Sequence, residues 1–163
     1  MPQRIIIVGN SGSGKSTYAK QLATRHGLVH VDLDPYAWRP TDPPTRRSVE
    51  ASMAELRAAL PEEGWVVEGC YADILRGLAQ DAQLLVFLNP GVEACVRHCS
   101  ARPFEAHKYD SPEAQDANLA MLIEWVRGYA TREGPMSLAG HRALFDAFEG
   151  EKQELTDPQT WMP

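Results

Sequence analysis

Residues 9–16 read GNSGSGKS and directly follow the apolar run IIIV at residues 5–8. The stretch fits the phosphate-binding pattern G-x-x-x-x-G-K-[ST], in which a buried strand leads into a glycine-rich loop and the loop leads into a helix. Residues 16–23, STYAKQLA, continue with helical spacing. The context therefore predicts a P-loop that binds a nucleoside triphosphate, and disfavours a turn that only joins a strand to a helix.

Each residue type in this loop has a chemical reason to be there. Three glycines let the backbone turn sharply and point successive N–H groups at phosphate oxygens, at the start of the following helix. Lys15 supplies a charge for the β- and γ-phosphates, and the hydroxyl of Ser16 can ligate magnesium. We expect ATP and Mg²⁺ as cofactors. The expected nucleotide-binding residues are Gly9, Gly12, Ser13, Gly14, Lys15, Ser16 and Thr17.

Composition narrows the class of protein further. A chain of 163 residues with 44% hydrophobic residues predicts a single domain over residues 1–163 with a full core. The net charge of −6 argues against a broad nucleic-acid surface, and no apolar run is long enough to cross a membrane. Three cysteines are too few for a disulfide framework and favour a reducing compartment. We therefore expect a cytoplasmic protein.

Apolar runs alternate with helical patterns along most of the chain, which is typical of an α/β fold with a parallel sheet between two layers of helices. The segment 34–45 has prolines and aromatic residues but no period, so we expect a loop over the site. Residues 102–110 are short, polar and charged, as in a mobile lid. The expected strands are residues 4–8, 28–32, 65–68, 84–89 and 152–155.

Acidic residues follow the second and third of these strands. Asp32 and Asp34 would share a face if the strand period continued, at the carboxyl edge where ligands of α/β folds bind. One could hold magnesium through water, and the other could accept the proton of an acceptor hydroxyl. Glu68, followed by Gly69, is a candidate for a magnesium-bound water or for substrate. The alternative is that these acids only end strands or begin a turn.

Missing motifs help to choose among P-loop proteins. The chain has no Asn-Lys-x-Asp segment for reading guanine, and no apolar strand ends in the Asp-Glu pair common in ATPases that activate water. The fourth strand ends in Asn89-Pro90 instead. These features favour a kinase, which needs a second site that aligns an acceptor with the γ-phosphate and excludes water.

The sequence resembles the adenylate-kinase-like P-loop small-molecule kinases, and most closely the small DNA topology-modulation proteins, with shikimate and gluconate kinases as more distant relatives. The resemblance covers nearly the whole chain. It depends on the loop 9–16, on His30-x-Asp32 followed by Trp38, and on the segment WVVEGCY at residues 65–71. Glu68 and Cys70 depart from the family pattern, which has aspartate and asparagine at these two positions. The acceptor therefore cannot be inferred from a relative.

The resemblance implies a three-layer α/β/α fold, a five-stranded parallel sheet in the order 2-3-1-4-5, and an acceptor-binding segment within residues 34–60. It also suggests that an arginine beside the lid, Arg97 or Arg102, closes onto the transferred phosphoryl group. The alternative is an arginine at a helix end that pairs with the helix dipole or with solvent. Further arginine candidates are Arg46, Arg47, Arg127 and Arg132.

Together these observations predict an ATP-dependent phosphotransferase that acts on a small acceptor, either a nucleoside monophosphate or a hydroxylated metabolite. The competing hypothesis is a nucleotide-responsive regulatory protein that acts through a macromolecular partner. Trp38 and Tyr71 either stack on a planar acceptor or pack the loop. His26, His98 and His141 are expected at the surface or in packing. The expected catalytic residues are Lys15, Asp34 and Arg102; the substrate-binding residues Asp34, Glu68, Gly69, Tyr71 and Arg47; and the metal ligands Ser16 and Asp32.

Overall fold

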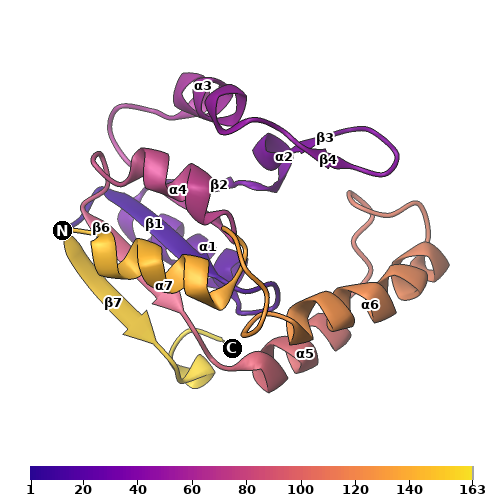
Figure 1. The fold of residues 1–163 in the computed structure, drawn as a ribbon. Coiled ribbons are helices and arrows are strands. Elements are labelled where there is room, and N and C mark those ends of the chain that lie inside the picture. The colour runs from indigo at the N-terminus through magenta and orange to yellow at the C-terminus, as the bar shows by residue number, and fades with distance from the viewer. Residues whose placement is uncertain (163) are drawn as a thin grey trace.

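The computed structural model describes residues 1–162 and shows a parallel five-stranded sheet in the order β2-β5-β1-β6-β7 (Figure 1). The expected α/β fold and the expected strand order are confirmed, because the third large strand inserts between the first and the second. Pro163, the last residue of the expected domain, lies outside the described residues. The sheet strands are β1 (Arg4–Gly9), β2 (Val29–Asp32), β5 (Trp65–Gly69), β6 (Leu84–Leu88) and β7 (Glu151–Leu155).

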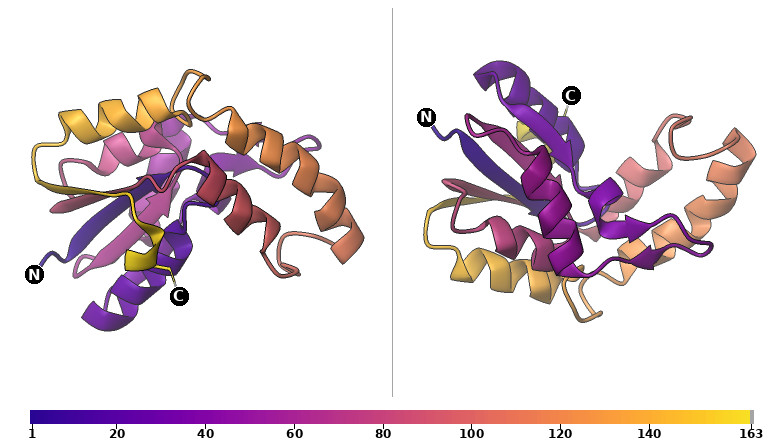
Figure 2. Two further views of the ribbon diagram at one scale, coloured as in Figure 1. Left: turned by 90° about the horizontal axis from the view of Figure 1, so that it is seen from below. Right: turned by 90° about the horizontal axis from the view of Figure 1, so that it is seen from above.

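Helices cover both faces of the sheet, which makes three layers (Figure 2). One face packs against α3, α4 and α7, and the other packs against α1 and the end of the chain. Each of these helices is too short or too polar to span a lipid bilayer, as are all the helices within residues 1–162. The helices are α1 (Lys15–His26), α2 (Asp34–Ala37), α3 (Val49–Ala59), α4 (Ala72–Leu78), α5 (Val92–Ser100), α6 (Pro112–Arg127) and α7 (Leu138–Ala147).

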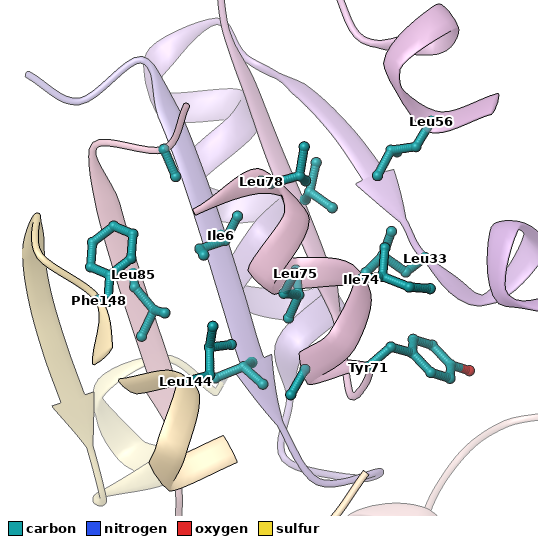
Figure 3. Close-up of a cluster of buried hydrophobic side chains, with 14 of the residues drawn as sticks. Ile6, Leu33, Leu56, Tyr71, Ile74, Leu75, Leu78, Leu85, Leu144 and Phe148 are labelled. Atoms are coloured by element: carbon teal, nitrogen blue, oxygen red, sulfur yellow. The ribbon is translucent and has the colours of Figure 1, made fainter. Parts of the chain in front are cut away.

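The central strands are buried on both faces, which explains their continuous apolar sequences. Alternate residues of β1 belong to different clusters: Ile6 packs beneath α4 and α7, whereas Ile5 packs against α1. Figure 3 shows the first cluster, in which Leu75 of α4 and Leu144 of α7 lie over the sheet. This rigid core fixes the positions of the strand ends that carry the candidate site.

Helices α5 and α6 pack against each other beyond the carboxyl end of the sheet (Figure 2). Cys95 and Cys99 lie on the buried face of α5, and they pack there against Val126 of α6. Ser111 caps α6 by accepting a hydrogen bond from the amide of Ala114. Residues 101–111, which include the expected lid, join the two helices without helix or strand.

The segment 34–45 differs from the expected loop. It forms the short helix α2 and a two-stranded antiparallel ribbon, β3 (Trp38–Arg39) and β4 (Thr45–Arg46). Pro35 lies in the first turn of α2, where its fixed backbone angle suits a helix. Because β2 ends at Asp32, Asp34 belongs to a helix, and the predicted shared strand face of Asp32 and Asp34 is wrong.

The end of the chain supports the P-loop. After β7 and a short 3-10 helix (Pro158–Thr160), Trp161 is only 2% exposed and packs in the cluster under α1. Its indole N–H donates to the carbonyl of Ser13 at 3.0 Å, and its own carbonyl accepts from the side chain of Gln21 at 2.9 Å. A hydrogen bond between Ser13 and Trp161, which lie 148 positions apart in the sequence, thus helps to hold the P-loop in place.

Candidate functional site

The P-loop has the geometry that phosphate binding requires. Gly12 and Gly14 adopt φ values of 81° and 90°, in the left-handed region that glycine favours. A Cβ on Gly12 would lie 2.3 Å from the carbonyl oxygen of Cys95, so only glycine fits there. Gly14 caps α1, whose first turn has no acidic residue that would oppose an anion. This cradle and the exposed start of the helix fit a triphosphate.

Three adjoining pockets form one cleft across the carboxyl edge of the sheet. A phosphate pocket of about 390 Å³ lies over the P-loop, a junction of about 80 Å³ follows, and an acceptor pocket of about 510 Å³ extends toward α6. Arg102 and Lys108 line all three. Lys15 and Ser16 connect the phosphate pocket to the junction, and Asp34 connects the junction to the acceptor pocket.

Most of the expected nucleotide-binding residues line this cleft. Gly12, Gly14, Lys15, Ser16 and Thr17 border the phosphate pocket, whereas Gly9 and Ser13 are buried beneath it. The ammonium group of Lys15 donates to the carbonyl of Asn10 at 2.8 Å, so it is held within the loop. The structure therefore gathers the expected residues at one place.

The strand ends bring Ser16, Glu68 and His30 together. The hydroxyl of Ser16 donates to Oε1 of Glu68 at 2.8 Å, and Nε2 of His30 lies 3.3 Å from the same oxygen. Burial by itself raises the pKa of Glu68, but the hydrogen bond from His30, the charge of Lys15 and the Ser16 hydroxyl bring that pKa below its ordinary value. Glu68 is 2% exposed and keeps its negative charge near neutral pH.

Asp32 has the opposite environment. Burial raises the pKa of Asp32 to about 6, and the negative charges of Asp34 and Glu68 act in the same direction. The amide of Asp34 donates to Oδ1 of Asp32 at 2.9 Å, which fixes the two acids side by side. Asp32, Asp34 and Glu68 are neighbouring carboxylates at a junction that Lys15, Arg102 and Lys108 also line, and a bound cation would reduce the repulsion among the three acids.

This donor set fits magnesium. Among residues 1–162 no three His, Cys, Asp or Glu side chains converge into a complete metal centre. Magnesium in nucleotide sites, however, keeps several waters and binds through one or two carboxylates and the phosphates. The hydroxyl of Ser16 and the carboxylates of Asp32 and Glu68 are the oxygen ligands available beside the P-loop.

The acceptor pocket begins with a chain of hydrogen bonds. The indole of Trp38 donates to the hydroxyl of Tyr71 at 2.7 Å, and this hydroxyl donates to Oδ1 of Asp34 at 2.7 Å. The rings of Trp38 and Tyr71 meet edge to face. The two aromatic residues therefore pack together, as one of the sequence-based alternatives has it, and they also line the pocket; stacking on an acceptor stays a prediction.

The loop 102–110 closes the cleft from the side of α5 and α6. Nζ of Lys108 lies 3.8 Å from Oδ2 of Asp34 and 3.8 Å from Oε1 of Glu105. No sequence motif indicates this lysine as a site residue. The side chain of Gln115 accepts from the amide of Glu105 and donates to the carbonyl of Pro103, so α6 holds this loop. Arg102 is exposed at the rim of the cleft.

Other candidate arginines lie outside the lining of the cleft. Arg47 pairs with Glu55 of α3, and Arg127 pairs with Glu93 at 2.8 Å. Arg132 donates to the carbonyls of Met136 and Trp125, and its guanidinium lies over the ring of Trp125. Arg97 is exposed on α5. Of the arginines named from the sequence, the structure brings Arg102 to the cleft.

Two histidines have structural partners that the sequence did not reveal. Nδ1 of His98, on α5, donates to the carbonyl of Gly12 at 2.6 Å and so ties α5 to the P-loop. His141 is fully buried, as its expected packing role requires. Its Nε2 donates to the carbonyl of Cys70 at 2.7 Å, and its Nδ1 accepts from the hydroxyl of Tyr129 at 2.6 Å. No local sequence pattern signals these long-range contacts.

The fold and the loop define a P-loop nucleotide-binding protein with a three-layer α/β/α architecture. The sequence model of the AAA domain family matches residues 5–110, which is more than half of the chain, and the chain belongs to this family. No curated protein matches it.

Two of the solved structures that are similar to the chain are kinases. One is a shikimate kinase from Acinetobacter baumannii in complex with shikimate. The two sequences are 20% identical, the alignment covers 87% of this chain and 90% of that chain, and the TM-score is 0.44. The other is an unliganded sugar kinase from Janibacter sp. HTCC2649. The two sequences are 14% identical, the alignment covers 99% of this chain and 91% of that chain, and the TM-score is 0.47. The closer likeness to DNA topology-modulation proteins stays a prediction.

Proposed function

We propose that this protein is an ATP-dependent phosphotransferase that moves the γ-phosphoryl group to a hydroxyl group of a small acceptor. One observation carries the proposal: the phosphate pocket and a second, larger pocket meet at a small junction lined by Lys15, Ser16, Asp34, Arg102 and Lys108. A nucleotide switch needs only the first pocket. A kinase needs both pockets and a narrow connection at which donor and acceptor meet in line.

The charged groups at the junction suit the transfer step. The acceptor oxygen forms a bond to the γ-phosphorus, the bond from that phosphorus to the β,γ-bridging oxygen breaks, and ADP leaves with the electron pair. Asp34 accepts the hydroxyl proton, because it is the acid that lines both the junction and the acceptor pocket. Lys15 and Arg102 stabilise the charge on the transferred group.

The remaining acids belong to the metal side of the junction. When bound, Mg²⁺ would neutralise phosphate charge there. Ser16, Asp32 and Glu68 are the residues that would hold it, directly or through water, because they lie beside the phosphate-binding lysine. In this proposal Glu68 orients Ser16, and Gly69 lets the backbone of the same strand end approach the junction.

The proposal is tested by ADP release in the presence of a panel of acceptors. Lys15→Ala should lower acceptor-stimulated release by about a hundredfold or more. Lys152→Ala is the matched control, because it removes the one lysine that lies away from the cleft pockets. Both variants should unfold at the same urea concentration as the native chain. Full turnover by Lys15→Ala would refute the mechanism.

A second pair of variants tests the acceptor side. Asp34→Asn should lower turnover by about 10²- to 10⁴-fold while ATP still binds. Asp116→Asn makes the same change on the exposed face of α6 and should have no effect. If release ignores every acceptor but responds to added DNA or protein, the regulatory hypothesis is supported instead.

A further inference from the structure

We infer that the acceptor is an uncharged alcohol with a flat aromatic ring, such as a nucleoside, and that it has neither a phosphate nor a carboxylate. The inference rests on the proposed function and names the substrate class of the same site. It follows from what lines the acceptor pocket: walls that are mainly aromatic and apolar, an acid at the junction, and, within residues 1–162, no cation other than Arg102 and Lys108, which also line the junction.

The walls of the acceptor pocket are mainly aromatic and apolar. Met121 and Trp125 of α6 are 69% and 41% exposed, although large apolar side chains usually avoid water. They line the same pocket as Trp38 and Tyr71. A ring bound between these surfaces would cover apolar area that is otherwise exposed.

Two cations near this pocket, Arg46 and Arg132, have other partners. Arg46 pairs with Asp73 at 3.1 Å and lies over the rings of Tyr71 and Trp38, which places it behind the aromatic wall and outside the lining. Arg132 is held by two carbonyls and the ring of Trp125. Within residues 1–162, Arg102 and Lys108 are the cationic side chains that line the pocket, and both also line the junction and the phosphate pocket.

Lys108 is already matched by acids, and Arg102 also lines the phosphate pocket, where it would meet the nucleotide. Asp34 and Glu105 line the acceptor pocket beside them, and Lys108 lies within 3.8 Å of both carboxylates. A triphosphate in the phosphate pocket would claim the same positive charge. An acceptor with its own phosphate would therefore meet Asp34 without a compensating cation, and burying an unpaired anion is costly.

The uncharged polar groups of the pocket suit a neutral ligand. The side-chain amide of Asn118 donates to the hydroxyl of Tyr109 at 2.8 Å, and both residues line the pocket. Hydrogen bonds from such groups can read the edge of a ring or a sugar hydroxyl.

The experiment compares nucleosides with their own 5′-monophosphates. Binding is measured by tryptophan fluorescence and by calorimetry on the full chain, in the presence of Mg²⁺ and a non-hydrolysable ATP analogue, and ADP release is measured with ATP. We expect at least one nucleoside to bind about tenfold or more tightly than its monophosphate, and to have the higher kcat/KM. Tighter binding of the monophosphate or of shikimate would overturn the inference, as would a panel in which no nucleoside or other neutral aromatic alcohol binds.

Two variants of α6 sharpen the test. Met121→Arg places a cation in the lining of the pocket and should shift the preference toward the monophosphate by about tenfold. Ala120→Arg adds the same charge at an exposed position outside the lining and should leave the preference unchanged. A shift of equal size in both variants contradicts the inference, because it would reflect net charge alone.

The binding and turnover measurements separate this inference from the proposed function. If neutral aromatic alcohols bind as expected but no compound of either kind stimulates ADP release, the phosphotransferase proposal fails while the pocket's specificity stands. If anionic compounds bind more tightly and stimulate release, the phosphotransferase proposal stands and the neutral acceptor is wrong.

Discussion

Protonation of His141 should destabilise this protein in a definite pH range. The imidazole is fully buried and lies between the hydroxyl of Tyr129 and the carbonyl of Cys70. Burial lowers its pKa from 6.5 to about 4. The unfolded chain therefore binds the proton more readily than the folded chain between these two values. The stabilising effect is complete above pH 6.5 and is lost as the pH falls toward 4.

The size of this effect follows from the same two pKa values. The two pKa values differ by about 2.5, which corresponds to a loss of about 3 kcal/mol in the free energy of unfolding once the pH is below both pKa values. At a pH of about 5 the corresponding loss is about 2 kcal/mol. The free energy of unfolding should be measured by urea titration at pH about 7.5 and about 5. His141→Gln should lose about 2 kcal/mol less than the native chain over this interval, although it should start from a lower stability.

A matched replacement separates His141 from the other titrating groups. His107→Gln alters an exposed histidine of the loop 102–110 and should keep the pH dependence of the native chain. If the native chain and His141→Gln lose equal stability between the two pH values, the burial argument is wrong. An imidazole signal of His141 that titrates above pH about 6 in an NMR experiment would refute it directly.

Two further substitutions test the support of the P-loop and the charge of the junction. Trp161→Ala should lower the free energy of unfolding by about 3–5 kcal/mol and weaken ATP binding. Trp161→Phe loses mainly the hydrogen bond to Ser13 and should lower the free energy of unfolding by about 1 kcal/mol. Urea unfolding and calorimetry measure these effects, and equal losses in the two variants would rule out a packing role. Asp32→Asn removes one of three clustered acids. It should stabilise the metal-free protein by about 1 kcal/mol after allowance for solvent screening, and it should lower Mg²⁺-dependent turnover. A less stable Asp32→Asn protein would show that the carboxylate stabilises the fold.

The fold was predictable because its strongest signals are local. The run 5–8, the glycine-rich loop after it and the apolar strand 84–88 can each be recognised from their own residues and from the residues that end them. The caps at Ser111 and Ser137 were likewise readable from a few residues. Strand order was less local, and the resemblance to a known family supplied it.

The site was predictable only in part, because its contacts join distant residues. Lys108 meets Asp34 across 74 positions of sequence, and no local pattern around Lys108 indicates such a partner. Asp34 was expected on a strand face, but Pro35 turns the chain into a helix at that point. Trp161 touches the P-loop from the opposite end of the chain. Spacing rules describe neighbours along one element, so they miss contacts of this kind.

The end of β5 couples the two halves of the site. Within four residues it supplies Glu68, which holds Ser16 of the P-loop, and Tyr71, which holds Asp34 of the acceptor pocket. Between them the carbonyl of Cys70 is fixed by His141 from α7, so the spacing of donor and acceptor pockets depends on one rigid segment. Cys70 also stands at the position where the resemblance to DNA topology-modulation proteins leads us to expect asparagine. A protonated thiol in place of an amide removes hydrogen-bonding capacity at the mouth of the acceptor pocket, which favours an apolar ring over a polar or charged group at that point.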